Sequence, residues 1–215
     1  MESIISGIGV LDKALGLVAH IEERPRNLAE LVERSGLSRS TNHRLASALE
    51  AHGLLGRDPD GRYHLGARLV GLGRSAAAAL PLAELAEPVL AELRDASGES
   101  TQLYVRRGEH RVCVASLDPP HELRTIVAVG AVLPLGVGSG GRLLDGESAG
   151  EHGWTESVED RAPGVASVSA PVCDRHGAVV AAISVSGPID RIGREPGERH
   201  GARVVAAAGA LEALI

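Results

Sequence analysis

Residues 36–45 read GLSRSTNHRL, and an apolar helical pattern follows them directly. The stretch holds three hydroxyl residues, an asparagine, a histidine and two arginines, where ordinary surface helices carry Glu and Lys. Short polar side chains of this kind cap helices, and they also reach phosphate oxygens and base edges without holding the backbone away. The stretch therefore predicts either a capped helix that faces water or a helix whose first turns bind a partner.

The residues around this stretch predict a winged helix-turn-helix. Asn27 and Glu30 form a capping-box pattern, Gly36 makes a turn, and Ser38 is the natural N-cap of the next helix. The turn DPDG, flanked by short apolar-polar runs, is typical of a β-hairpin. The three expected helices and the hairpin follow in this order: residues 9–23, 28–35, 39–53 and 54–66.

In this plan the third helix lies in the major groove with its first turns against the DNA, and the hairpin tip contacts the phosphate backbone. Arginines supply the positive charge in both places. The predicted DNA-binding residues lie on these two segments: Ser38, Arg39, Ser40, Thr41, His43, Arg44, Arg57 and Arg62.

The rest of the chain predicts an Ala-rich helical segment over 67–98, interrupted near Pro81, and then an α+β domain. Strands with Gly and Pro between them are expected at residues 100–107, 110–117, 123–129, 165–173 and 178–187, and a terminal helix at 195–215. We expect a DNA-binding domain at 1–74, a linker helix at 75–98 and a second domain at 99–215.

Composition is that of a soluble globular protein: 44% of the 215 residues are hydrophobic and 23% are charged. No apolar run is long enough to span a membrane, and the N-terminus has no signal-peptide pattern. Two lone cysteines, Cys113 and Cys173, fit a reducing cytoplasm and form no metal motif. The net charge of −6 is uneven, because residues 1–74 carry +1 and residues 75–215 carry −7. The first third is therefore the better candidate for binding an anionic polymer.

Several segments resemble the IclR family of bacterial transcription regulators. These are GVLDKALGLVAHI, LAELVERSGLSRSTNHRLASALEAHGLLGRD, GRYHLGARLVGLG and, more specifically, GVASVSAPVCDRHGAVVAAISVSGPIDRI. The resemblance covers nearly the whole chain. It implies a cytoplasmic homodimer or tetramer that binds operator DNA, with a GAF-like antiparallel-sheet domain for a small effector. The opening and the segment around QLYVR are similar to regulators of amino-acid biosynthesis, including leucine genes.

The segment GVGSGG, residues 136–141, matches a dinucleotide-binding fingerprint only formally, because no long βαβ unit and no suitably spaced acid follow. It fits better as a loop that opens a short helix, whose free N–H groups attract an anion. The resemblance places effector contacts there and on nearby strands: Ser139, Gly140, Ser157, Ser167, Ser184 and Ser186. A small carboxylate or amino acid is the expected ligand, against an apolar wall of Leu133, Leu135, Val165 and Ile183.

One departure from the family pattern lies after this helix. The family has a pair of helices where only nine residues, 145–153, join Leu144 to Trp154. Either the helices are deleted or a segment is omitted, and a deletion would remove one wall of the pocket.

Two other functions fit the sequence less well. An enzyme would need a catalytic constellation, and the nine scattered His, together with the lack of HExxH, GxSxG or paired carboxylates, favour none. A ligand sensor or scaffold without DNA binding would not need the stretch SRSTNHR. We therefore expect no catalytic residues, no cofactor and no metal.

Overall fold

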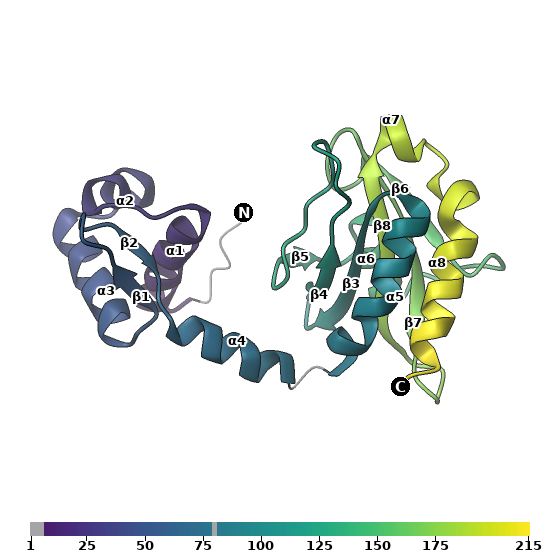
Figure 1. Ribbon diagram of the computed structural model, residues 1–215, viewed down its shortest axis with the longest axis horizontal. Helices are drawn as coiled ribbons and strands as arrows, with labels where there is room; N and C mark the ends of the chain where they lie inside the picture. Colours follow the sequence, from purple (N-terminus) through teal and green to yellow (C-terminus); the bar gives the residue numbers. More distant parts are fainter. Residues whose placement is uncertain (1–6, 79–80) are drawn as a thin grey trace. The chain divides into compact units, whose positions relative to one another are not determined.

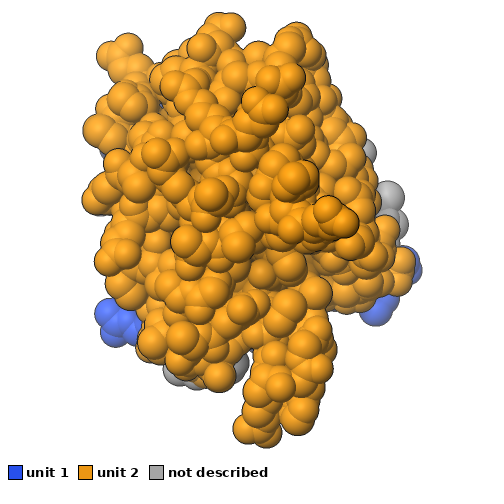
Figure 2. All heavy atoms as spheres, turned by 90° about the vertical axis from the view of Figure 1, so that its right-hand side faces the viewer, with its two compact units in different colours: residues 1–79 blue, residues 80–215 orange. Residues whose placement is uncertain are grey.

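The computed structural model describes residues 7–78 and 81–215 (Figure 1). The chain divides into two units, residues 1–79 and 80–215, which Figure 2 draws in different colours. The elements of the first unit are α1 (Gly9–Glu23), α2 (Leu28–Ser35), α3 (Arg39–Ala51), β1 (Leu55–Arg57), β2 (Tyr63–Leu65) and α4 (Arg68–Ala78).

The first unit is the predicted winged helix-turn-helix. Its core consists of buried side chains from all three helices and the hairpin: Leu17, Ile21, Leu31, Leu45, Ala46, Leu49, Leu55 and Tyr63. The capping box of Asn27 and Glu30 is present, and Gly36 ends α2 in the left-handed conformation at φ 65°. The hairpin pairs Leu55 with Leu65, and its β2 strand also exchanges backbone hydrogen bonds with Arg26.

A buried asparagine fixes the turn between α2 and α3. The Asn42 amide donates to the carbonyls of Leu37 and Ser38 over 3.0 and 3.2 Å, and its oxygen accepts from the Ser35 hydroxyl. All the hydrogen-bonding groups of this fully buried side chain are therefore used within the turn.

Replacing Asn42 by alanine is expected to lower the free energy of unfolding of the first unit by ~1–3 kcal/mol, because three polar partners lose a buried hydrogen bond. Urea unfolding followed by far-UV circular dichroism measures this loss. Glu33→Ala, at an exposed position of α2, is the matched control and should change stability by less than ~0.5 kcal/mol. Equal effects of the two substitutions would refute this role.

The second unit is a six-stranded antiparallel sheet with helices on both faces. Its strand order is β5-β4-β3-β8-β7-β6. The elements are α5 (Pro81–Ser97), β3 (Ser100–Arg107), β4 (His110–Leu117), β5 (Val132–Pro134), α6 (Gly138–Leu144), β6 (Thr155–Val158), β7 (Val165–Cys173), β8 (Val179–Pro188), α7 (Ile189–Ile192) and α8 (Pro196–Glu212). The predicted α+β class, with a wing and an antiparallel sheet, is confirmed.

One face of the sheet is apolar and is covered by α5 and α8, which lie side by side in Figure 1. Alternate strand residues point into this core, among them Leu103, Val168 and Ile183. Leu90 and Leu93 of α5 are buried there as well. The apolar face of α5 is thus covered by the chain's own sheet.

The strand predicted at 123–129 is wrong. Residues 123–129 alternate between buried and exposed, with Thr125 and Val127 buried and Ile126 exposed, yet they pair with no described strand. The three residues of β5 occupy that edge of β4 instead. The predicted helix break near Pro81 coincides with residues 79–80, outside the described residues, since α4 ends at Ala78 and α5 begins at Pro81.

No single described helix is both long and apolar enough to cross a membrane.

Candidate functional site

The outward face of α3 carries the charged side chains that the sequence singled out. At ~100° per residue, Arg39, Ser40, His43 and Arg44 fall on one side of the helix. The opposite side, with Leu45 and Leu49, is buried. Among the described residues, none forms a hydrogen bond or ion pair with the side chains of Arg39, His43 or Arg44, all three exposed. The helix therefore presents a cationic face that is satisfied only by solvent.

The hydroxyls at the start of α3 serve partly as caps. The Ser38 hydroxyl accepts from the Thr41 N–H over 3.2 Å and contacts the hydroxyls of Ser40 and Thr41 at 3.0 and 2.9 Å. Ser38 and Ser40 are exposed and Thr41 is half-buried. Both interpretations of the opening stretch therefore apply: the hydroxyls cap the helix, and their outer lone pairs remain open to a partner.

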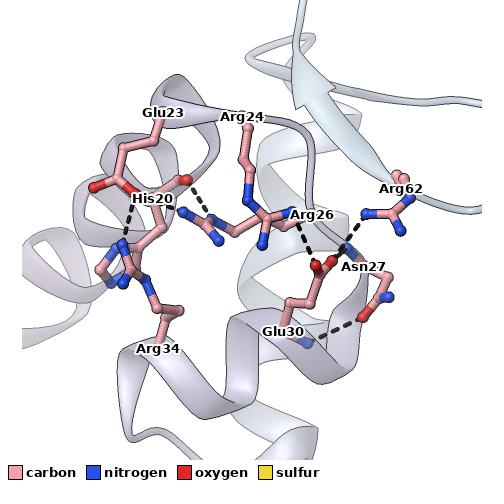
Figure 3. A network of polar contacts seen from close by, with 8 residues as sticks. All are labelled: His20, Glu23, Arg24, Arg26, Asn27, Glu30, Arg34 and Arg62. Atoms are coloured by element: carbon pink, nitrogen blue, oxygen red, sulfur yellow. Dashed lines mark hydrogen bonds and ion pairs between the residues drawn. The ribbon is translucent and has the colours of Figure 1, made fainter.

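The wing arginines differ from those of α3, because acidic residues already hold them. Arg62 forms an ion pair of 3.0 Å with Glu30, on which Arg24 also converges (Figure 3). Arg57 lies 4.5 Å above the centre of the Tyr63 ring, donates to its hydroxyl and is 3.4 Å from Glu50. A phosphate would therefore compete with a carboxylate for each wing arginine.

The backbone N–H of Asn27 and then the Arg24 side chain lower the pKa of Glu30, which keeps that carboxylate charged. Glu23 binds Arg26 and Arg34 in the same region, and Arg34 chiefly lowers the pKa of Glu23 (Figure 3). These carboxylates neutralise several arginines of the first unit, whereas Arg39 and Arg44 of α3 have no carboxylate partner among the described residues.

The second unit gathers hydroxyls on the sheet face opposite the apolar core. The register across β6, β7 and β8 aligns Ser157, Ser167 and Ser186 in one row. In the next row Ser169 lies opposite Ser184, and Ser184 lies opposite Gln102 of β3. Helix α6 covers these rows and brings Ser139 and Gly140 to them, so all six predicted effector residues line one cavity.

The glycines of GVGSGG allow this close approach. A Cβ at Gly140 would lie 3.0 Å from the Ser184 hydroxyl oxygen, and a Cβ at Gly141 would overlap the Arg111 guanidinium. The segment therefore packs a short helix onto a polar sheet face.

Ser139 is the centre of the hydroxyl network. Its hydroxyl is 2.7 Å from those of both Ser167 and Ser169, and Ser169 continues to Ser184 at 2.5 Å. Its N–H donates to the Ser157 hydroxyl over 3.1 Å. The Gly138 N–H donates to Asp160 over 2.6 Å. Two of the N–H groups at the start of this helix, those of Gly138 and Ser139, thus already have acceptors within the chain.

The sequence reasoning missed Gln102, Tyr104, Arg111 and Arg161 of the cavity lining, and two of these are buried polar residues without a full set of partners. Arg111, on β4, is 3% exposed and has no ion pair with any described residue; its Nη1 donates to the Val137 carbonyl and its Nε has no partner. Gln102 is fully buried, and its amide nitrogen also lacks a partner. Burial lowers the pKa of Arg111. A signal was present for Gln102, a polar residue within a mostly apolar strand, but not for Arg111, which lies next to the exposed turn between β3 and β4.

The cavity is small and mostly polar. About 20 Å³ is open to the centre of a water molecule, which is room for one water. Of the four residues expected as apolar wall, Val165 lines the cavity, whereas Ile183 points into the core on the other sheet face. Leu133 and Leu135 pack in a separate cluster with Leu143. The expected aliphatic wall is therefore wrong for Ile183, Leu133 and Leu135, because strand alternation sends Ile183 away from Ser184 and the two leucines pack in another cluster.

The cysteines carry no sign of catalysis. Burial raises the pKa of the Cys113 thiol to about 12, so it stays protonated and is a poor nucleophile. Burial also raises the pKa of Cys173.

Comparison with known families matches both units. Residues 10–59 match the family described as the IclR helix-turn-helix domain. Residues 74–145 and 147–213 match the family described as the bacterial transcriptional regulator IclR C-terminal domain.

Individual relatives agree with this match. The chain is 30% identical over 206 residues to the glycerol operon regulatory protein of Streptomyces griseus, covering 79% of this chain and 80% of that protein. It is 25% identical over 237 residues to the transcriptional repressor IclR of Escherichia coli K12, covering 92% and 86%. The fold is similar to that of the Thermotoga maritima IclR crystal structure, with a TM-score of 0.76, 19% identity, and 96% and 98% of the two chains covered. An IclR homolog from Microbacterium hydrocarbonoxydans, complexed with 4-hydroxybenzoate, gives a TM-score of 0.73 at 21% identity, covering 93% and 98%.

These relatives are longer than this chain in the matched region. Since 92% of 215 residues is about 198, the E. coli repressor has about 39 more residues there. The family match is interrupted at Gly146, within the junction between α6 and β6. In the structure residues 145–154 form turns that lead directly from Leu144 into β6, so the sheet is complete without an intervening helix pair.

Proposed function

This chain belongs to the IclR family of DNA-binding transcription regulators, which are not enzymes, and from that premise we propose that it binds a near-palindromic operator as a homodimer or tetramer. The observation that carries the proposal is the open cationic face of α3, where Arg39, His43 and Arg44 have no partner among the described residues. We assign base and phosphate contacts to the first turns of α3, and further phosphate contacts to Arg57 and Arg62 of the wing. The bacterial cytoplasm is the compartment that this function requires.

Dimer formation is supported by the geometry of recognition. A single reading helix contacts few base pairs, and two-fold pairing doubles their number. Helices α1 and α4 carry apolar side chains that the described part of the chain leaves exposed: Val10, Leu11, Leu15, Val70 and Leu72. Such side chains are suited to contact a second copy.

We further propose that a small carboxylate in the hydroxyl-lined cavity changes operator occupancy by binding the DNA-bound and free conformations with different affinity. Ser139, Gly140, Ser157, Ser167, Ser184 and Ser186 are the proposed contacts. The cavity lining holds two arginines and no carboxylate, and this local positive charge supports an anionic ligand. Control of amino-acid genes remains the proposed physiological role.

We expect the 215-residue chain to shift a DNA fragment from upstream of its own gene in a gel-shift assay, with affinity that falls as salt rises. A panel of leucine, valine, their keto acids and 4-hydroxybenzoate, the last taken from the Microbacterium homolog, tests the ligand. A compound of the proposed class should change the shift at millimolar concentration. Absence of any shift at low salt would favour the sensor or scaffold function.

A further inference from the structure

The cavity of the second unit holds two buried hydrogen-bond donors that nothing in the described chain satisfies. Gln102 and Arg111 are 0% and 3% exposed, and the Nε2 and Nε nitrogens have no partner among the described residues. Both side chains line the same cavity. Buried donors without acceptors are costly, and a buried cation without a counter-ion is more so.

We propose that Arg111 and Gln102 are the specificity-determining residues of the effector pocket, and that the ligand is a small hydroxyl-rich carboxylate such as a hydroxy acid or sugar acid. This inference rests on the proposed effector function and names its ligand class. The carboxylate binds the Arg111 guanidinium, and the Gln102 amide donates to a ligand oxygen.

The surroundings of Arg111 fit an anion. Its guanidinium carbon lies 5.0 Å from the centre of the Tyr104 ring. This cation–π contact positions the guanidinium but leaves its positive charge without a counter-ion. The half-buried Arg161 also lines the cavity, and no Asp or Glu does. A guanidinium can donate two parallel hydrogen bonds, from its Nε–H and an Nη–H, to the two oxygens of one carboxylate.

The other cavity walls fit hydroxyl groups. The serine hydroxyls bond mainly to one another, with Ser139 contacting Ser167 and Ser169 at 2.7 Å. A hydroxyl both donates and accepts hydrogen bonds. These serine side chains can therefore rotate to bond the hydroxyls of a ligand without reducing their number of hydrogen bonds. Gln102 keeps its own acceptor occupied, because its Oε1 receives the Ser186 hydroxyl at 3.0 Å, and only its NH₂ group is available.

An aliphatic ligand would be poorly matched. Apart from Tyr104 and Val165, the cavity has no apolar side chain, so a leucine or valine side chain would bury the serine hydroxyls without new partners. The cavity has room for one water, so even a small ligand requires the side chains at its mouth to move aside.

Calorimetry on the 215-residue chain with glycerate, propanoate, glycerol, leucine and inorganic phosphate tests this inference. Glycerate carries both features, propanoate lacks the hydroxyls and glycerol lacks the carboxylate. We expect glycerate to bind at millimolar concentration or below, at least 10-fold more tightly than each of the other four. If glycerate and the longer gluconate both fail to bind, the inference is overturned.

Arg111→Gln and Gln102→Glu are the matched variants. Gln102→Glu keeps the acceptor for Ser186 and replaces only the unpartnered donor by an oxygen that repels a carboxylate. Each should weaken glycerate binding about 10- to 100-fold, the equivalent of one buried hydrogen bond to a charged group. Arg111→Lys should retain part of the affinity. Arg106→Gln, on the exposed end of β3, should retain all of it.

Circular dichroism and the midpoint of thermal unfolding separate binding from folding. If the role of Arg111 is to bind a ligand, Arg111→Gln should leave the midpoint of thermal unfolding unchanged or raise it, because the substitution removes an uncompensated buried charge. A lower midpoint with unchanged glycerate affinity would make Arg111 structural and overturn the inference. If leucine or propanoate binds as well as glycerate, this ligand class is wrong while the effector function stands. If no compound of this set or of the gel-shift panel binds, the effector function itself fails.

Discussion

The double variant R39A/R44A is expected to lose about 2–6 kcal/mol of operator-binding free energy, because each arginine of a recognition helix contributes about 1–3 kcal/mol when it contacts a base. Both side chains lie on the exposed face of α3 and have no partner among the described residues, so their removal costs the folded protein little. Fluorescence anisotropy with labelled upstream DNA measures the loss.

The single variants distinguish a base contact from a phosphate contact. If Arg44 binds a base, Arg44→Ala lowers specific binding more than non-specific binding. If Arg44 binds a phosphate, the substitution weakens both and makes the salt dependence shallower by about one ion. Arg34→Ala removes the same charge from an arginine already paired with Glu23 at 2.6 Å and serves as the control. Unchanged operator affinity of R39A/R44A would rule out α3 as the reading helix.

Arg191→Ala is expected to have the largest effect on stability, lowering the free energy of unfolding of the second unit by about 3 kcal/mol. Arg191 binds Glu99 through two hydrogen bonds of 2.6 and 2.7 Å, and the Glu99 side chain is 4% exposed. Without the guanidinium a buried carboxylate loses its counter-ion, which costs ~3–5 kcal/mol. The lower value applies because a third of the Arg191 side chain is exposed to solvent.

Urea unfolding followed by tryptophan fluorescence measures the stability of the second unit, which contains Arg191 and Glu99. Trp154 is the only tryptophan, and its ring packs against Gly197 and Gly201 of α8. The double variant E99Q/R191A also removes the unpaired buried charge of Glu99, and it should be more stable than Arg191→Ala alone. If Arg191→Ala unfolds at the same urea concentration as the parent chain, the ion pair contributes nothing.

The first unit was largely predictable because its signals are local. Asn27, Gly36 and Ser38 mark helix ends through their own backbone and side-chain chemistry, and the structure has each in that role. The role of Asn42 was not predictable, because an asparagine inside a helical pattern carries no sign that it will be buried in a turn.

The sheet was predictable only where strands are long. β5 and β6 have three and four residues, too few to show a periodicity, and they exist because β4 and β7 offer them an edge. The segment 123–129 has a strand-like pattern but no partner among the described strands, and pairing is a property of the whole sheet.

The serines of the candidate pocket could be predicted from the sequence, but its buried positive charge could not. Ser184 and Ser186 follow from strand alternation and from the family resemblance. Arg111 lies in a strand that begins near an exposed hairpin, where an arginine usually faces solvent. Only the packing of α6 at Gly141 shows that its side chain is buried.

Strand β3 has two faces, and neighbouring residues on it serve different parts of the molecule. Gln102 lines the cavity, whereas the adjacent Thr101 donates its hydroxyl to the Leu90 carbonyl of α5 over 3.0 Å. One peptide unit therefore separates a cavity side chain from the helix that connects the second unit to the rest of the chain. If a cavity ligand changes the affinity for operator DNA by some factor, operator DNA must change the affinity for that ligand by the same factor.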